Sequence, residues 1–130
     1  MENAILVAGI GTDVGKTVLS GIICRALNAD YWKPVQAGDL DNSDSMKVKR
    51  FAPSSVIHPE TFLLNTPMAP HESAHRDKIE MSLQDFVIPQ TENLLVIEMA
   101  GGLMVPINED ELYIVNLFAI LFTAVKIIKP

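Results

Sequence analysis

The sequence has few of the features that mark secreted or membrane-spanning proteins. It contains one cysteine, Cys24, so no disulfide can form within the chain, as is usual in the reducing cytoplasm. Residues 1–3 carry no positively charged segment of the kind that opens a secretory signal. The longest apolar run, 112–125, is interrupted by Asn116 and Thr123 and is shorter than the ~20 residues needed to span a bilayer. We therefore expect a cytoplasmic protein that does not insert into a membrane.

Basic residues are also scarce. The chain has 10 Lys and Arg against 16 Asp and Glu, for a formal net charge of −6, so we expect no nucleic-acid partner. Hydrophobic residues make up 48% of the chain and charged residues 20%, a composition that favours a packed core over disorder. The length of 130 residues indicates a single domain that covers the whole chain.

Short apolar runs alternate with segments of helical spacing. Continuous apolar runs predict strands that are buried on both faces, and apolar residues that recur at three and four predict helices. The apolar runs 4–8 and 94–97 are predicted strands, and short strands are also predicted at 31–35 and 125–128. The predicted helices are 16–27, closed by Asn28, 44–51 and 112–122. Ser82 and Asp85 have the spacing of a capping box, whereas residues 52–81 fit neither pattern. The alternation predicts an α/β fold, a parallel sheet with flanking helices.

A glycine-rich loop follows the first predicted strand and precedes the first predicted helix, where a phosphate-binding loop belongs. It runs from Gly9 to Thr17 and reads GIGTDVGKT. Its backbone N–H groups and the helix dipole favour an anion, Lys16 adds a point charge, and the Thr17 hydroxyl can hold Mg²⁺. The standard loop has four residues between its glycines, whereas five separate Gly9 from Gly15. The alternative is an ordinary strand–helix turn that happens to contain Gly-Lys-Thr.

Charged side chains follow the other predicted strands. Lys33 lies near the end of the second strand, and Glu98 comes directly after the apolar run LLVI. Ligands bind at the carboxyl ends of strands in open α/β sheets, so both side chains are candidates for a site there. Together with Thr17 and Asp44, Glu98 offers oxygens for Mg²⁺. The alternatives are a solvated lysine, a surface acid, and an Asp44 that only caps the helix beginning there.

Residues 71–75 match the zinc-protease signature H-E-x-x-H. On a helix, His71 and His75 would share one face with Glu72 as the base. A tetrahedral catalytic site needs a third protein ligand, and the one remaining histidine, His58, lies upstream behind prolines. We therefore do not expect metalloprotease chemistry.

Five segments, in the right order, resemble motifs of the dethiobiotin synthetase family. They are GIGTDVGKT at 9–17, WKPVQAG at 32–38, NSD at 42–44, APH at 69–71 and EMAGG at 98–102. The resemblance covers residues 4 to about 110, which is only about the first half of a typical family member. It implies a P-loop NTPase-like parallel sheet with flanking helices, truncated relative to the family, so that residues 1–130 form a partial ATP-binding domain.

The family closes a cyclic urea on 7,8-diaminopelargonic acid with CO₂ and MgATP, and gives dethiobiotin, ADP and phosphate. The resemblance implies that a substrate amine forms a carbamate, that the carbamate oxygen takes the γ-phosphoryl group, and that the second amine displaces phosphate. It implies ATP and Mg²⁺ as cofactors, small-molecule substrates and, as in the family, a homodimer. It is compatible with two other functions: a non-catalytic nucleotide-binding remnant of the family, and a partitioning ATPase, although the early second lysine of that class is missing here.

The resemblance also assigns site residues. Lys16 and Lys33 are the expected catalytic residues, and Thr17, Asp44 and Glu98 the expected Mg²⁺ ligands. The expected nucleotide contacts are Thr12, Asp13, Val14, Gly15, Lys16, Thr17, Asp44, Glu98, Ala100 and Gly101. The expected substrate contacts are Thr12, Ala37 and His71.

The chain departs from the family pattern at four positions. Ile10 and Gly11 differ within the phosphate loop. Ala37 stands where the family has a hydroxyl for the substrate, which removes a hydrogen bond worth about 1 kcal/mol. Met99 replaces a glycine, and it would obstruct the site if that position needs a positive φ or a close approach to phosphate.

Overall fold

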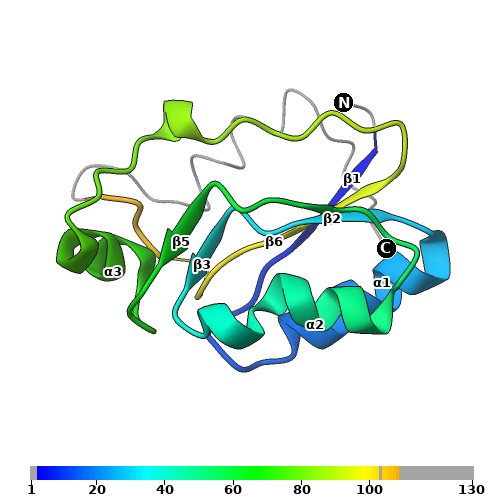
Figure 1. Cartoon of the computed structure of the whole chain (residues 1–130), viewed down its shortest axis with the longest axis horizontal. Helices are drawn as coiled ribbons and strands as arrows, with labels where there is room; N and C mark the ends of the chain where they lie inside the picture. Colours follow the sequence, from blue (N-terminus) through cyan, green and yellow to red (C-terminus); the bar gives the residue numbers. More distant parts are fainter. Residues whose placement is uncertain (1–2, 103, 109–130) are drawn as a thin grey trace.

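The larger sheet of the computed structural model, which describes residues 3–102 and 104–108, has four strands that pair in parallel. Their order is β1 (Ala4–Val7), β6 (Leu95–Glu98), β2 (Asp30–Trp32) and β4 (Ile57–His58). The helices α1 (Lys16–Leu27) and α2 (Asp44–Phe51) lie together on one face (Figure 1). The α/β fold with a parallel sheet and flanking helices is confirmed. No helix in the described part of the chain is long and apolar enough to cross a membrane.

A second, two-stranded sheet lies beside the first. It pairs β3 (Val35–Ala37) with β5 (Phe62–Leu64) in parallel, next to α3 (Pro70–Asp77). The prediction of one strand over residues 31–35 was therefore wrong. The chain leaves the larger sheet at Lys33-Pro34 because proline has no N–H to donate to a ladder. The Pro34 carbonyl instead accepts hydrogen bonds from the N–H groups of Thr61 and Phe62.

The predicted helices lie almost where the spacing placed them. Helix α1 ends at Leu27, and Asn28 follows in the left-handed conformation with its N–H on the Cys24 carbonyl. Helix α2 has the predicted bounds, but its cap is Ser43, whose side chain accepts from the Met46 N–H, and not Asp44. The predicted capping box opens only a single 3₁₀ turn, Leu83–Asp85; another such turn spans Leu40–Asn42. The predicted helix 112–122 and strand 125–128 lie outside the described residues.

Side chains alternate between the two faces of the larger sheet. Val7, Tyr31 and Val96 pack with residues of α1 and α2. The intervening residues, among them Trp32 and Leu95, pack against the segment that crosses the other face between α3 and β6. Because strand side chains repeat every two residues, the next positions along β2 and β6 on the helix-covered face are Lys33 and Glu98. The fold thus presents both side chains beneath the helices, at the carboxyl edge of the sheet.

The opposite end of β2 is anchored by a buried carboxylate. Asp30 accepts hydrogen bonds from the Thr91 hydroxyl at 2.6 Å and the Asn93 side-chain amide at 3.2 Å, and His58 Nε2 lies 3.5 Å from it. Burial raises the pKa of this carboxyl, but the hydrogen bonds together outweigh burial and leave the pKa below its ordinary value. The ionised form of Asp30 therefore ties β2 to the segment before β6.

We expect Asp30→Asn to lower the free energy of unfolding by about 1–3 kcal/mol at pH 7, because buried donors lose a charged acceptor. Since the pKa is depressed in the folded state, the stabilisation is present above the ordinary Asp value of about 3.9 and is lost as the pH falls through the folded value. Urea unfolding at pH 7 and below pH 4 measures this difference. Asp41→Asn, an exposed acid, is the control, and a deficit in Asp30→Asn that stays constant down to pH 3 would contradict the prediction.

Candidate active site

The phosphate loop accommodates its long glycine spacing by close packing. A Cβ on Gly9 would lie 2.7 Å from the Val14 side chain, so residue 9 has no room for one. Asp13 and Gly15 both have left-handed backbones, with φ of 55° and 97°. Gly15 then caps α1, and the Leu19 N–H donates to its carbonyl. Gly9 thus serves as the first glycine of the loop although it lies one residue further from Gly15 than the standard pattern requires.

Lys16 bends back over this loop from the first turn of α1. Its ammonium donates to the Gly11 carbonyl at 2.5 Å, and the residue is 9% exposed. Burial, reinforced by the charge of Lys33, lowers the pKa of Lys16. The loop therefore holds a desolvated positive charge against its own backbone, beside the N–H groups of the helix start.

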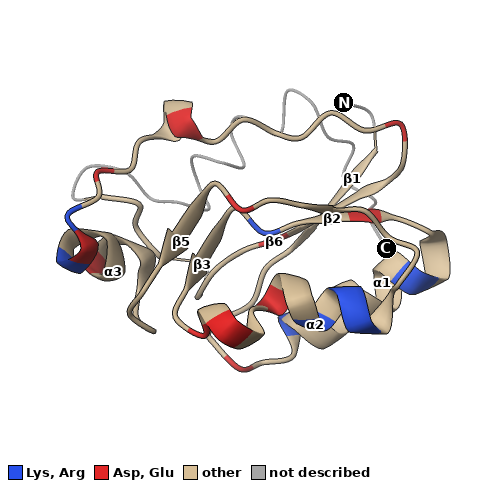
Figure 2. Cartoon of the chain, viewed as in Figure 1, with Lys and Arg blue, Asp and Glu red and all other residues tan. Residues whose placement is uncertain are grey.

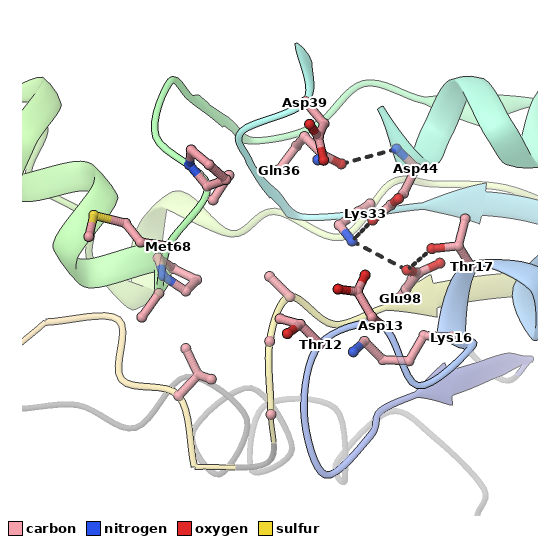
Figure 3. Close-up of a pocket in the computed structure, with 18 of the residues that line it drawn as sticks. Thr12, Asp13, Lys16, Thr17, Lys33, Gln36, Asp39, Asp44, Met68 and Glu98 are labelled. Atoms are coloured by element: carbon pink, nitrogen blue, oxygen red, sulfur yellow. Dashed lines mark hydrogen bonds and ion pairs between the residues drawn. The ribbon is translucent and has the colours of Figure 1, made fainter. Parts of the chain in front are cut away.

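The buried carboxylate of Glu98 bonds to Thr17, at the start of α1, and to Lys33, which follows β2 (Figure 3). Its Oε1 accepts from the Thr17 hydroxyl at 2.8 Å and from Lys33 Nζ at 3.3 Å. Lys33 is itself almost fully buried and forms a second ion pair with Asp44. The three predicted oxygen donors and Lys33, one of the two predicted catalytic lysines, are thus in one connected network.

The charges of this network balance locally. Burial raises the pKa of Asp44, but Lys33 and Lys47 outweigh it, so the pKa is lowered and the carboxylate is ionised. Lys47 Nζ lies 3.2 Å from the carboxylate of Asp44, the first residue of α2. The first turn of this helix is acidic and its last turn is basic, which also suits the helix dipole (Figure 2). A buried charge without such partners would be strongly unfavourable.

Two carboxylates and a hydroxyl form the oxygen set of this network. Mg²⁺ in phosphate sites is usually bound through one or two carboxylates together with phosphate oxygens and waters. Within the ranges that the structure describes, no cluster of three or more His, Cys, Asp or Glu could hold a metal. The donors Thr17, Asp44 and Glu98 therefore fit a magnesium ion that is shared with a bound phosphate, and not an all-protein metal cage.

The network borders a cavity of about 720 Å³, within the usual range for small-ligand sites. The predicted residues that line it are Thr12, Asp13, Gly15, Lys16, Thr17, Lys33, Ala37, Asp44, Glu98, Ala100 and Gly101. Residues 67–70 line it as well. The structure therefore brings eleven of the thirteen predicted site residues to one cavity.

The two exceptions are Val14 and His71. The Val14 side chain is 52% exposed and packs against Gly9, so only its backbone belongs to the loop. His71, at the start of α3, lines a second cavity of about 1100 Å³ together with Glu72 and His75. Met68 lines both cavities, which makes them neighbours. The role of His71 in substrate binding stays a prediction, and the H-E-x-x-H residues belong to this second cavity.

Met99 does not obstruct the site. Its side chain is fully buried in the core, its φ is not positive, and its N–H donates to the Val7 carbonyl at 3.0 Å. The left-handed residue of this loop is Gly101, with φ of 66°, where a Cβ would also approach Val105 to 2.7 Å. Ala37, in contrast, does line the cavity, so the hydroxyl that the family has there is missing from its wall.

Gln36 and Tyr31 are among the residues of the site that were not predicted. The Gln36 side chain accepts from the Asp44 N–H at 3.2 Å and donates to the Gly38 carbonyl at 2.9 Å, which fixes the start of α2 against the end of β3. The Tyr31 hydroxyl donates to Glu98 Oε2 at 2.9 Å. Burial, followed by the charge of Glu98, raises the pKa of Tyr31, so this hydroxyl stays protonated. The one sequence signal for Tyr31 was its spacing of two from Lys33.

Comparison with known proteins tests the family resemblance that the sequence motifs indicated. The family model described as an AAA domain matches residues 3–125. The ATP-dependent dethiobiotin synthetase BioD of Christiangramia forsetii is 53% identical over 113 residues, 85% of this chain and 55% of the relative. The proteins of the same name from Afipia carboxidovorans and Paramagnetospirillum magneticum are 50% and 46% identical over 88% and 85% of this chain, and over 56% and 54% of their own lengths.

These matches confirm the resemblance to the dethiobiotin synthetases that the five sequence segments indicated. The chain spans about half the length of the curated relatives it matches. The family model covers nearly all of the chain, including the phosphate loop and the end of β6. The chain belongs to the AAA-domain family.

Proposed function

We propose that this chain binds MgATP in the 720 Å³ cavity and takes part in the ATP-dependent carboxylation and ring closure of 7,8-diaminopelargonic acid to dethiobiotin, a step of biotin biosynthesis. The observation that carries the proposal is the network of Thr17, Lys33, Asp44 and Glu98 beside the phosphate loop. The relatives named dethiobiotin synthetase support the reaction type. We further propose that the protein acts in the cytoplasm as a homodimer.

ATP binding follows from the loop. The triphosphate would lie against the N–H groups at the start of α1, and Lys16 would exchange the Gly11 carbonyl for phosphate oxygens. Thr17, Asp44 and Glu98 would hold Mg²⁺, which when bound neutralises the charge that develops on the transferring phosphoryl group. The exchange suits Lys16, because an ammonium already removed from water loses little hydration when an anion arrives.

The substrate chemistry needs positive charge close to an anionic carbamate and the γ-phosphate. Lys33 lies between β2 and β3 in the chain, and its two carboxylate partners hold its ammonium at the border of the cavity. Lys16, from the first turn of α1, supplies a second charge to the same cavity. Fixing both charges before the reactants arrive lowers the barrier, because the charges need no reorganisation during the reaction. Thr12 and Ala37 would contact the diamine from the cavity wall.

We expect MgATP turnover to depend on the diamine. ADP release measured in bicarbonate buffer should rise when 7,8-diaminopelargonic acid is added, and Lys33→Ala should lower the stimulated rate by about 100-fold or more, since it removes a preorganised charge. ADP release that the diamine leaves unchanged, in a folded sample that binds MgATP, would contradict the reaction and support the alternative of a non-catalytic nucleotide-binding protein.

Lys16→Ala should weaken MgATP binding by at least about 30-fold, because it removes a buried charge from the phosphate site. Isothermal titration calorimetry with MgATP measures this change. Arg25→Ala, on an exposed position of the last turn of the same helix, is the matched control and should bind like the unmodified chain. An unchanged affinity in Lys16→Ala would show that the loop does not hold the phosphates.

A further inference from the structure

We infer that Tyr31 is a positioning residue for magnesium: its hydroxyl fixes the Glu98 carboxylate so that one oxygen faces the nucleotide site. This inference rests on the proposed MgATP function. It adds a residue that lies outside the cavity lining and acts through Glu98.

The two oxygens of Glu98 have separate partners. Oε1 is bonded to two residues that line the cavity, Thr17 at 2.8 Å and Lys33 at 3.3 Å. Oε2 accepts from the hydroxyl of Tyr31 at 2.9 Å, a residue that does not line the cavity. Tyr31 and Glu98 are both buried, so the hydroxyl meets Oε2 inside the protein and not at its surface. The rotation of the carboxylate about its last bond is therefore set by Tyr31 from within the protein.

The sheet explains how Tyr31 reaches this oxygen. In the ladder between β2 and β6, Tyr31 is paired with Val96, two residues before Glu98 on the same strand face. Tyr31 belongs to the hydrophobic cluster beneath the helices, which also includes Val7, Val48 and Val96. From that position its hydroxyl extends towards the carboxyl edge. The ring is part of the hydrophobic core, and the hydroxyl donates a hydrogen bond to the Glu98 carboxylate.

Removing the hydroxyl would leave Oε2 buried with one partner fewer. A carboxylate in this state gains from rotating or from drawing Lys33 closer, and either change reduces what Oε1 can offer to a metal ion. Groups that hydrogen-bond to a metal-ligating carboxylate typically change metal affinity by 10- to 100-fold when they are lost. The effect belongs to Mg²⁺ and not to the phosphate loop, which makes it separable from a general loss of structure.

Tyr31→Phe tests this inference, because it keeps the ring and removes the hydroxyl. We expect the apparent Mg²⁺ affinity of the ATP-bound chain, measured by titrating Mg²⁺ at fixed ATP in a calorimeter, to fall by about 10-fold or more. ATP binding without Mg²⁺ should not change, and excess Mg²⁺ should restore full MgATP affinity. Thr91→Val is the matched control, because it removes a hydroxyl-to-carboxylate bond at the far end of β2.

Two unnatural residues at position 31 test the same bond should Tyr31→Phe fail to fold. 4-Aminophenylalanine keeps a donor at the ring end, whereas 4-methylphenylalanine has similar size and no donor. The first should retain the Mg²⁺ affinity of the unmodified chain and the second should lose it. Equal Mg²⁺ titrations for the donor and the non-donor would overturn the inference while MgATP binding stands, and an unmodified chain that binds no MgATP would overturn both it and the proposed function.

Discussion

Glu98 places a carboxylate with no exposure to solvent at the end of a strand that lies between two others, and such a charge persists only where the protein supplies its partners. Thr17 supplies one from α1, Tyr31 another from the middle of β2, and Lys33 a third from the position that follows β2. Removing one partner of a buried pair is far more costly than the pair is worth, because a lone charge remains. Because the Glu98 carboxylate is buried, these three residues are needed for the stability of the fold as well as for the site.

The parallel topology makes this convergence possible. β6 lies between β1 and β2, so Val7, Glu98 and the residue after Trp32 come to the same edge although they are far apart in sequence. The phosphate loop leaves from β1 at this edge, and α2 begins beside it through the Gln36–Asp44 hydrogen bond. A shift of one residue in the register of β6 would turn Glu98 to the other face of the sheet and break the network.

Much of this could be predicted from the sequence because the signals are local. The run at 94–97 and the acid after it, and the loop between Gly9 and Thr17, determine the strand ends and the anion site. The second sheet could not be predicted, since β3 and β5 are three residues each and are defined by their pairing, not by periodicity. Tyr31 was missed because a tyrosine in a strand is ordinarily read as a core residue, and its hydroxyl partner depends on the ladder register. Ser43 as the cap of α2 was missed because Asp44, its neighbour, is an equally good capping residue type.

The departures from the family pattern divide according to what they face. The Ile10 side chain is 88% exposed, and the Ile10 carbonyl lies only 3.0 Å from where a Cβ of Gly102 would be. The backbone of the phosphate loop thus packs against the loop that follows Glu98, and this contact leaves little space for a Cβ at residue 102 but sets no requirement on the side chain at residue 10. The side chain of Met99 lies in the core, whereas Ala37 lies in the cavity wall. Of these changes, Ala37 alone alters the surface offered to a ligand, so it is the departure that bears on what the cavity accepts.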